Sequence, residues 1–269
     1  MSTYSKEHIQ YLHRQKREKK VIFFFRLFII IIFLIIWELL SRFGIINTFL
    51  SSSPTKVVET IISLLQDKTL FIHIGVTLYE VIISFFIASI IGFVVATTLW
   101  SNKIIAKIVD PYLTVLNSLP KVALGPLIII WVGASINSII FMALLISTFV
   151  TIITIYQGFS STDKKYIKLL QTLGAKKLQI FMKAVLPSNI PTIISALKIN
   201  ISMSLIGVIM GELLVSKSGL GYLIMYGSQV FNINLVITGV VILGIISYLM
   251  YLIVDIIEVK TKKKMGMIN

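Results

Sequence analysis

The chain has 269 residues, of which 57% are hydrophobic and 13% are charged, and its mean hydropathy is +0.95. A soluble protein of this length needs a more polar surface, so the composition indicates an integral membrane protein. The formal net charge of +14 would suit nucleic-acid binding in a soluble protein, and the absence of cysteine excludes disulfides and thiolate metal sites.

The N-terminal part predicts a basic tail followed by a first transmembrane helix. Residues 1–20 are polar and basic, and residues 21–40 form an almost unbroken apolar run. The run is long enough to cross a bilayer, and it exceeds the core of about 7 to 15 residues expected of a cleaved secretory signal. We therefore expect a retained span at 21–40.

An outer loop is expected over residues 41–74. Within it, Ser53 as N-cap and Pro54 at the first helical position predict a short helix lying on the membrane surface.

Residues 75–258 are expected to form the main transmembrane domain. A second span is predicted over 75–100, with Ala88, Gly92 and Ala96 as a small-residue packing stripe and Glu80 solvated near the outer end. Prolines then interrupt the apolar sequence, so the third span, roughly 122–132, is expected to be broken and to lie inside the assembly.

Three further spans are expected after the turn at 133–137. The fourth covers 138–158, the fifth 193–214 and the sixth 235–257, with a flexible outer loop at 217–222. Lys198 in the fifth span is expected to extend toward the inner membrane surface. A second basic tail, residues 259–269, ends the chain.

Residues 163–187 predict a helical elbow between the fourth and fifth spans. Ile167, Leu170 and Leu173 share one helical face with Tyr166, and lysines occupy the other. Gly174 is placed to end the first helix in a left-handed conformation, after which a second helix can begin at Lys177.

The basic residues alternate along the chain. Lys and Arg number 19 in the four segments expected inside and four in the segments expected outside. By the positive-inside rule, both termini and the elbow are cytoplasmic. The charge is thereby explained without nucleic-acid binding.

Three motifs resemble the permease subunits of binding-protein-dependent ABC importers, in their nitrate, sulfonate and taurine branch. Gly174-Ala175 with Leu186-Pro187 is similar to the cytoplasmic loop of that family. The stretches 119–133 and 211–222 are similar to its other signatures. The resemblance implies an all-α fold of six transmembrane helices of the type I importer class, in the cell membrane, with a cytoplasmic coupling helix that docks on an ATPase.

The resemblance also implies partners and site residues. The partners are two ABC ATPase subunits that carry ATP and Mg²⁺, an extracellular solute-binding protein, a second copy of the chain and the lipid bilayer; no cofactor is expected on the chain itself. The coupling residues would be Ile167, Lys168, Leu170, Leu173, Gly174, Ala175, Leu186 and Pro187. Lys168 stands where the family usually has glutamate, which removes any salt bridge from that position.

A translocation path is expected from polar residues on irregular or interior segments: Asn117, Ser118, Pro120, Ser202, Ser204 and Glu212. For these side chains the alternative is hydrogen bonding between helices, and for Glu212 a structural role at the dimer interface. The solute stays open among small organic anions such as alkanesulfonates, nitrate or taurine and a thiamine-precursor pyrimidine.

Two other classes of function are weighed against the importer. A self-sufficient secondary transporter would need paired ionisable groups and commonly an inverted repeat, and an intramembrane enzyme would need clustered catalytic groups. The candidate groups that the sequence offers for such a role, Glu80, Lys198 and Glu212, are isolated from one another along the chain. The sequence also has no phosphate-binding G-x-x-x-x-G-K-[ST] loop, so ATP is expected on another chain and the protein is not expected to be an enzyme.

Overall fold

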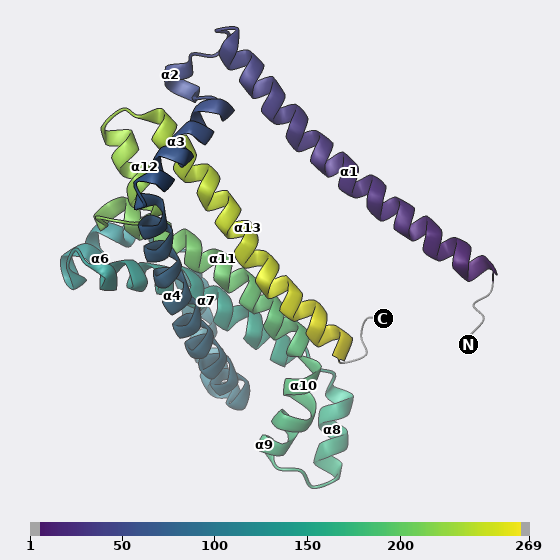
Figure 1. The fold of residues 1–269 in the computed structure, drawn as a ribbon. Coiled ribbons are helices and arrows are strands. Elements are labelled where there is room, and N and C mark those ends of the chain that lie inside the picture. Colours follow the sequence, from purple (N-terminus) through teal and green to yellow (C-terminus); the bar gives the residue numbers. More distant parts are fainter. Residues whose placement is uncertain (1–5, 265–269) are drawn as a thin grey trace.

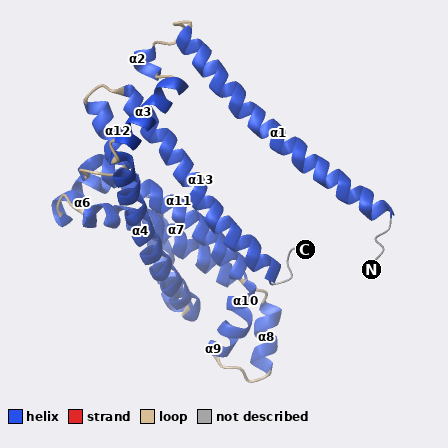
Figure 2. Cartoon of the chain, in the orientation of Figure 1, coloured by secondary structure: helices blue, strands red, loops and turns tan. Residues whose placement is uncertain are grey.

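The computed structural model describes residues 6–264, and over this range the chain is helical and contains no strand (Figure 2). Helices α1 to α4 cover Lys6–Arg42, Thr48–Ser51, Pro54–Gln66 and Thr69–Ser101. Helix α5 (Lys103–Ser118), the 3-10 turn η1 (Lys121–Leu124), α6 (Gly125–Val132) and α7 (Ile136–Ser161) follow. The remainder comprises α8 (Lys164–Thr172), α9 (Lys177–Ile180), the π turn η2 (Phe181–Val185), α10 (Leu186–Ser188), α11 (Ile190–Val215), α12 (Leu220–Gln229) and α13 (Ile233–Lys264).

In the described part of the chain, five helices are long and apolar enough to cross a membrane: α1, α4, α7, α11 and α13. The sixth expected span is the pair formed by α5 and the η1–α6 segment, which are bent by 83° at Leu119 and Pro120. Leu119 is extended because the residue before a proline disfavours the helical conformation. The all-α multispanning fold is confirmed, and the third span is broken as predicted.

The core of the bundle is the contact of α7 with α4 and α11, and α13 packs alongside α11 (Figure 1). Ala88, Gly92 and Ala96 of α4 are buried, and a side chain at Gly92 would lie 2.5 Å from Thr151 on α7. On the other flank of α7, a side chain at Gly207 of α11 would collide with the backbone of Ala143. Small residues therefore let three helices approach closely, as the stripe in α4 predicted.

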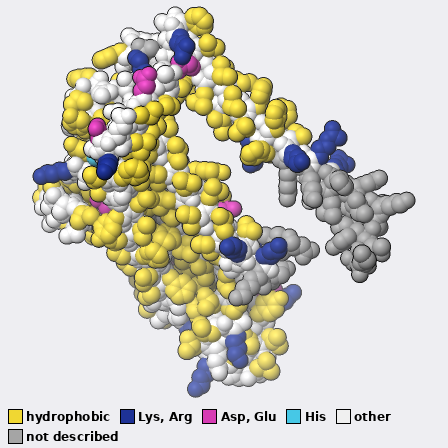
Figure 3. All heavy atoms as spheres, in the orientation of Figure 1, with side chains coloured by type: hydrophobic (Ala, Val, Ile, Leu, Met, Phe, Trp, Pro, Cys, Tyr) yellow, Lys and Arg dark blue, Asp and Glu magenta, His cyan; other side chains and the backbone are white. Residues whose placement is uncertain are grey.

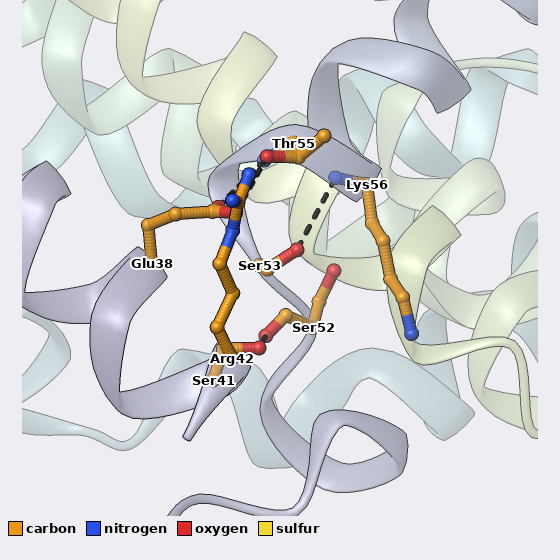
Figure 4. Close-up of polar contacts among 7 residues, drawn as sticks. All are labelled: Glu38, Ser41, Arg42, Ser52, Ser53, Thr55 and Lys56. Carbon is orange, nitrogen blue, oxygen red and sulfur yellow. Dashed lines mark hydrogen bonds and ion pairs between the residues drawn. The ribbon is translucent and has the colours of Figure 1, made fainter. Parts of the chain in front are cut away.

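Helix α1 lies apart from the bundle along most of its length and joins it at one end (Figure 1). The join is made by Glu38, whose carboxylate accepts hydrogen bonds from the backbone N–H of Thr55 at 3.1 Å and its hydroxyl at 2.7 Å (Figure 4). Arg42 donates to the same carboxylate at 2.7 Å. Ser53 accepts from Lys56 N–H at 3.3 Å, which confirms it as the N-cap of α3.

At the end of the bundle away from residues 163–187, α4, α11 and α12 meet at a buried polar cluster, which we call the outer polar cluster. Glu212 is 1% exposed; it accepts from the Thr77 hydroxyl at 2.6 Å and from Gly221 N–H at 2.5 Å. Glu80 is 2% exposed and hydrogen-bonds with Glu212. The prediction that Glu80 is solvated was wrong, because the face of α4 that carries it packs against α11.

The segment 217–222 is not the flexible outer loop that was predicted. Gly219 has φ +113°, and a side-chain carbon added there would lie 2.4 Å from the Glu212 carboxylate; α12 begins at the next residue. Leu220 is fully buried, and its N–H donates to Thr77 at 2.8 Å. The glycines permit a close approach of backbone to carboxylate, and this fixes the segment.

Lys198 has acidic partners on a neighbouring helix, which the sequence analysis did not identify. Its ammonium group pairs with Asp255 of α13 at 2.5 Å and also with Glu258. Its ammonium also lies 5.1 Å from the centroid of the Tyr251 ring. The charge is thus neutralised between α11 and α13 within the bundle.

The α7–α11 contact gives a stability prediction. Gly207→Ala should destabilise the protein by about 1 to 3 kcal/mol, because the new methyl group meets backbone atoms of α7 that cannot move aside. The measurement is the temperature at which the purified protein loses its monodisperse form in detergent. Gly244→Ala in α13 is the matched control, since no atom lies within 4 Å of its added carbon; equal behaviour of the two variants would contradict the packing account.

Candidate coupling surface

The elbow, residues 163–187, extends beyond the ends of α7 and α11 at one end of the molecule (Figure 1). It consists of α8 and a second arm made of α9, η2 and α10. Asp163 caps α8 by accepting from Lys165 N–H at 2.8 Å.

The turn between the two arms is built around Gly174, at φ +75°. Gly174 N–H donates to Gln171 O at 3.0 Å and Ala175 N–H to Leu170 O at 2.9 Å, the bond pattern of a Schellman motif. No atom lies within 4 Å of a carbon added at Gly174. The requirement for glycine is therefore conformational, and the predicted left-handed helix end is confirmed.

The second arm contains a widened turn near Pro187. Residues 181–185 form a π turn, and Leu186 N–H donates back to Phe181 O. Proline cannot donate a backbone hydrogen bond, and the Ser188 hydroxyl satisfies Ala184 O at 2.7 Å. The arm thus leads into α11 through a widened turn, and the Ser188 hydroxyl supplies a donor to one of its carbonyl groups.

The inner side of the elbow is anchored to the bundle through an apolar cluster. Ile180, Phe181 and Val185 are buried, and Ile167 and Leu170 pack against the same cluster. The Phe181 ring lies 5.1 Å from Trp100 of α4 and 5.3 Å from Phe159 of α7, between ring centroids. Both arms are therefore seated on the ends of the spanning helices.

Polar contacts fix the root of the elbow at two more points. The Asn189 side chain donates to the Thr162 hydroxyl at 2.7 Å, joining the segment before α8 to the start of α11. The Lys177 ammonium donates to the carbonyl of Ser101 at the end of α4. A displacement of the elbow must consequently move the ends of α4, α7 and α11 with it.

The outer side of the elbow carries exposed apolar side chains. Leu173 is 74% exposed and Leu178 is 72% exposed, although both are large and hydrophobic. They belong to a set that is exposed on both arms and that we call the outer apolar patch: Tyr166, Leu169, Leu173, Leu178 and Met182. Exposed apolar groups of this kind mark a surface that meets a partner.

The predicted coupling residues lie on two sides of the elbow, one facing the bundle and one exposed. Ile167 and Leu170 face the bundle, together with Ala175 and Leu186. Leu173, Lys168, Gly174 and Pro187 are exposed. The sequence reasoning missed Leu169 and Leu178; the spacing of Tyr166, Leu169 and Leu173 at i, i+3 and i+7 could have indicated a second apolar stripe.

The predicted path residues fall into two groups. Asn117, Ser118 and Pro120 are exposed at the bend between α5 and α6. Ser204 is buried and donates to Asn200 at 3.2 Å, Ser202 donates to Lys198 O at 3.3 Å, and Glu212 belongs to the outer polar cluster. Lys121, which was not singled out, donates to Asn117 O at 3.0 Å and so adds a positive charge at the bend.

A bundle of long apolar helices with a small helical elbow at one end is the architecture of a multispanning membrane protein. The sequence of residues 88–265 matches the family described as binding-protein-dependent transport system inner membrane component. The chain belongs to this family, the ABC transporter permeases, whose members are membrane subunits without catalytic activity of their own.

Two curated relatives carry different substrates in their names. The chain is 31% identical over 189 residues to the formylaminopyrimidine transport permease protein ThiX of Halalkalibacterium halodurans, covering 70% of this chain and 75% of that protein. It is 24% identical over 224 residues to the taurine transport system permease protein TauC of Escherichia coli, covering 81% and 82%.

The fold is also found among solved ABC importers. A chain of the MetNI methionine ABC transporter, in inward-facing conformations, superposes with a TM-score of 0.63 and 21% identity, over 74% of this chain and 97% of that one. The similarity confirms the type I importer fold expected from the motifs.

The turn at Gly174 gives a prediction that isolates backbone conformation. Gly174→Val should open the elbow about 5- to 30-fold more often, because a left-handed conformation costs a residue other than glycine about 1 to 2 kcal/mol. The measurement is the rate of trypsin cleavage after Lys176 and Lys177 in the folded protein, under conditions where cleavage follows the open population.

Gly174→Asn is the matched variant, since asparagine tolerates the left-handed region. It should be cleaved at nearly the rate of the unsubstituted protein. If Asn and Val accelerated cleavage equally, the Schellman turn would not be what holds the elbow closed.

Proposed function

We propose that this chain is the permease subunit of an ATP-driven importer and that the elbow couples it to an ATPase subunit. The observation that carries the proposal is the two-sided construction of the elbow. Its inner side is anchored to three spanning helices, and its outer side presents the outer apolar patch. Such a part can transmit force from a bound partner to the bundle.

The alternating distribution of lysine and arginine supports a cytoplasmic elbow and cytoplasmic termini. An ATPase in the cytoplasm could then reach the patch. ATP and Mg²⁺ are assigned to this partner.

The full assembly would contain two copies of this chain, two ATPase subunits and an extracellular solute-binding protein. Exposed apolar side chains on α5 and α6, such as Ile130 and Trp131, suit a face covered by the second copy. ATP binding would draw the two elbows together, and the rigid helices above them would rock from an inward-facing to an outward-facing arrangement.

The transported solute is proposed to be a small organic anion such as taurine, an alkanesulfonate or nitrate. Lys121 supports an anion because its charge lies beside Asn117 and near Ser118 at the bend of the broken span. A formylaminopyrimidine is the second candidate, and the 31% identity to ThiX favours it.

The outer apolar patch gives a direct test of coupling. Leu173→Asp combined with Leu178→Asp should reduce copurification of the ATPase subunit at least about tenfold, because hot-spot residues at interfaces each contribute roughly 2 kcal/mol or more. Both side chains are exposed, so the permease itself should stay folded and monodisperse in detergent. The measurement is the ATPase-to-permease ratio after affinity purification of the permease.

Gln171→Asp combined with Thr172→Asp is the matched control, since the pair adds the same two negative charges at exposed polar positions of α8. It should retain the ATPase. If the Leu173 and Leu178 double variant retained the ATPase, the outer apolar patch of the elbow would not be the docking site.

Transport itself is tested in proteoliposomes that contain the permease, its ATPase and its binding protein. Uptake of labelled taurine or formylaminopyrimidine should require all three components and ATP, and the solute that is accumulated identifies the substrate class. The permease alone should be inert. Accumulation by the permease alone, driven by an ion gradient, would instead establish a secondary transporter.

A further inference from the structure

A hollow of about 480 Å³ lies between the elbow and the adjoining ends of α4 and α7. Its floor is apolar and buried, and consists of Leu99, Phe159 and Ile180. Trp100 and Tyr156 line it as well. The hollow opens on a different side of the elbow from the outer apolar patch, none of whose residues lines it.

The rim of the hollow is strongly basic. Four lysines line it, and each is exposed: Lys103, Lys164, Lys168 and Lys177. None of these four pairs with a carboxylate of the described residues, and the lining contains no aspartate or glutamate. Lysine and arginine side chains are visible around this end of the molecule in Figure 3. The hollow therefore offers uncompensated positive charge above an apolar floor.

The position of the hollow matches a membrane surface. Helix α4 ends at Ser101, directly after Trp100, and tryptophan and tyrosine favour the depth of the lipid headgroups. Basic pockets between transmembrane helices on the cytoplasmic side are suited to anionic lipid headgroups. A free phosphate ion could form ionic contacts with the lysines but would gain nothing from the apolar floor. A phospholipid could place its phosphate near the lysines and its acyl carbons against the floor.

We propose that this hollow binds an anionic phospholipid, with its phosphate among the four lysines and its glycerol and upper acyl carbons against Leu99, Trp100 and Phe159. The lipid would touch α8, α4 and α7 at once. It would brace the root of the elbow from the membrane side, opposite the outer apolar patch.

The fluorescence of Trp100 can report on this site, because Trp100 lines the hollow. The chain has only two other tryptophans, and both can be replaced. Trp37→Phe with Trp131→Phe leaves Trp100 as the sole tryptophan. The full-length protein is placed in nanodiscs whose lipids are brominated either on phosphatidylglycerol or on phosphatidylcholine, at equal mole fraction. Brominated phosphatidylglycerol should quench Trp100 more strongly, and raised salt should weaken the difference.

The lysines are tested with paired variants of equal charge. Lys103→Gln with Lys168→Gln should lower the preference for the anionic lipid on the order of tenfold, because each lysine near an anionic surface contributes a factor of about five. Lys176→Gln with Lys183→Gln removes the same charge from exposed elbow positions outside the hollow and should leave the preference unchanged. Unchanged Trp100 emission in phosphatidylcholine alone shows that each variant is folded.

Three outcomes would overturn the proposal. Equal quenching by the two lipids would mean that no anionic lipid is selected. If both double-lysine variants lost the preference for the anionic lipid equally, the preference would come from the overall positive charge of the elbow and not from a defined site. A shift of Trp100 emission by inorganic phosphate in phosphatidylcholine nanodiscs, removed by the Lys103 and Lys168 variants, would make a free anion the ligand. Both faces of a nanodisc hold the same lipid and no ATPase is present, so the result does not depend on the sidedness or coupling proposed above.

Discussion

The close approach of α7 to both α4 and α11 is the constraint on which the rest of the structure depends. Helices in lipid gain nothing from excluding water, so their association depends on tight packing and hydrogen bonds. Gly92 and Gly207 meet this need on the two flanks of α7, where any larger residue would strike Thr151 or Ala143. The elbow is the connection from α7 to α11, and its position follows from theirs.

The two ends of this helical core are fixed in different ways. At the elbow, aromatic side chains of α4, α7 and the second arm pack edge to face or tilted. At the opposite end, Glu212 accepts hydrogen bonds from α4 and from the first turn of α12. A buried carboxylate needs such donors, because an unpaired charge in this environment is costly. The backbone at Gly219 and Gly221 passes close to the carboxylate. At this end of the bundle, buried polar contacts therefore hold α4, α11 and α12 together.

Features determined by local sequence could be predicted, and features determined by distant partners could not. The N-cap at Ser53, the helix end at Gly174 and the break at Pro120 depend on neighbouring residues alone. Thr77 and Glu212 are 135 positions apart, and Lys198 and Asp255 are 57 positions apart. Each ionisable residue taken singly was therefore assigned the environment of an unpaired one, so Glu80 was misplaced and the partners of Lys198 were missed. The apolar arc of α8 was recognised, but its division between bundle and outer patch depends on where Phe159 and Phe181 lie.

The ion pairs of Lys198 decide which helices can move together. Lys198 is on α11, the helix that leaves the elbow, and Asp255 and Glu258 join it to α13. A force at the elbow that displaces α11 must displace α13 too, unless a buried charge loses its partner. Helix α1 is joined to the bundle near its C-terminal end, through Glu38 and Ser41. The α5–α6 segment is bent by 83° and is flanked by Asn102 and Gly133, so its backbone can change direction without breaking a long helix. In the proposed coupling, motion of α4, α7, α11 and α13 would be expressed against the bent segment, where Asn117, Ser118 and Lys121 lie.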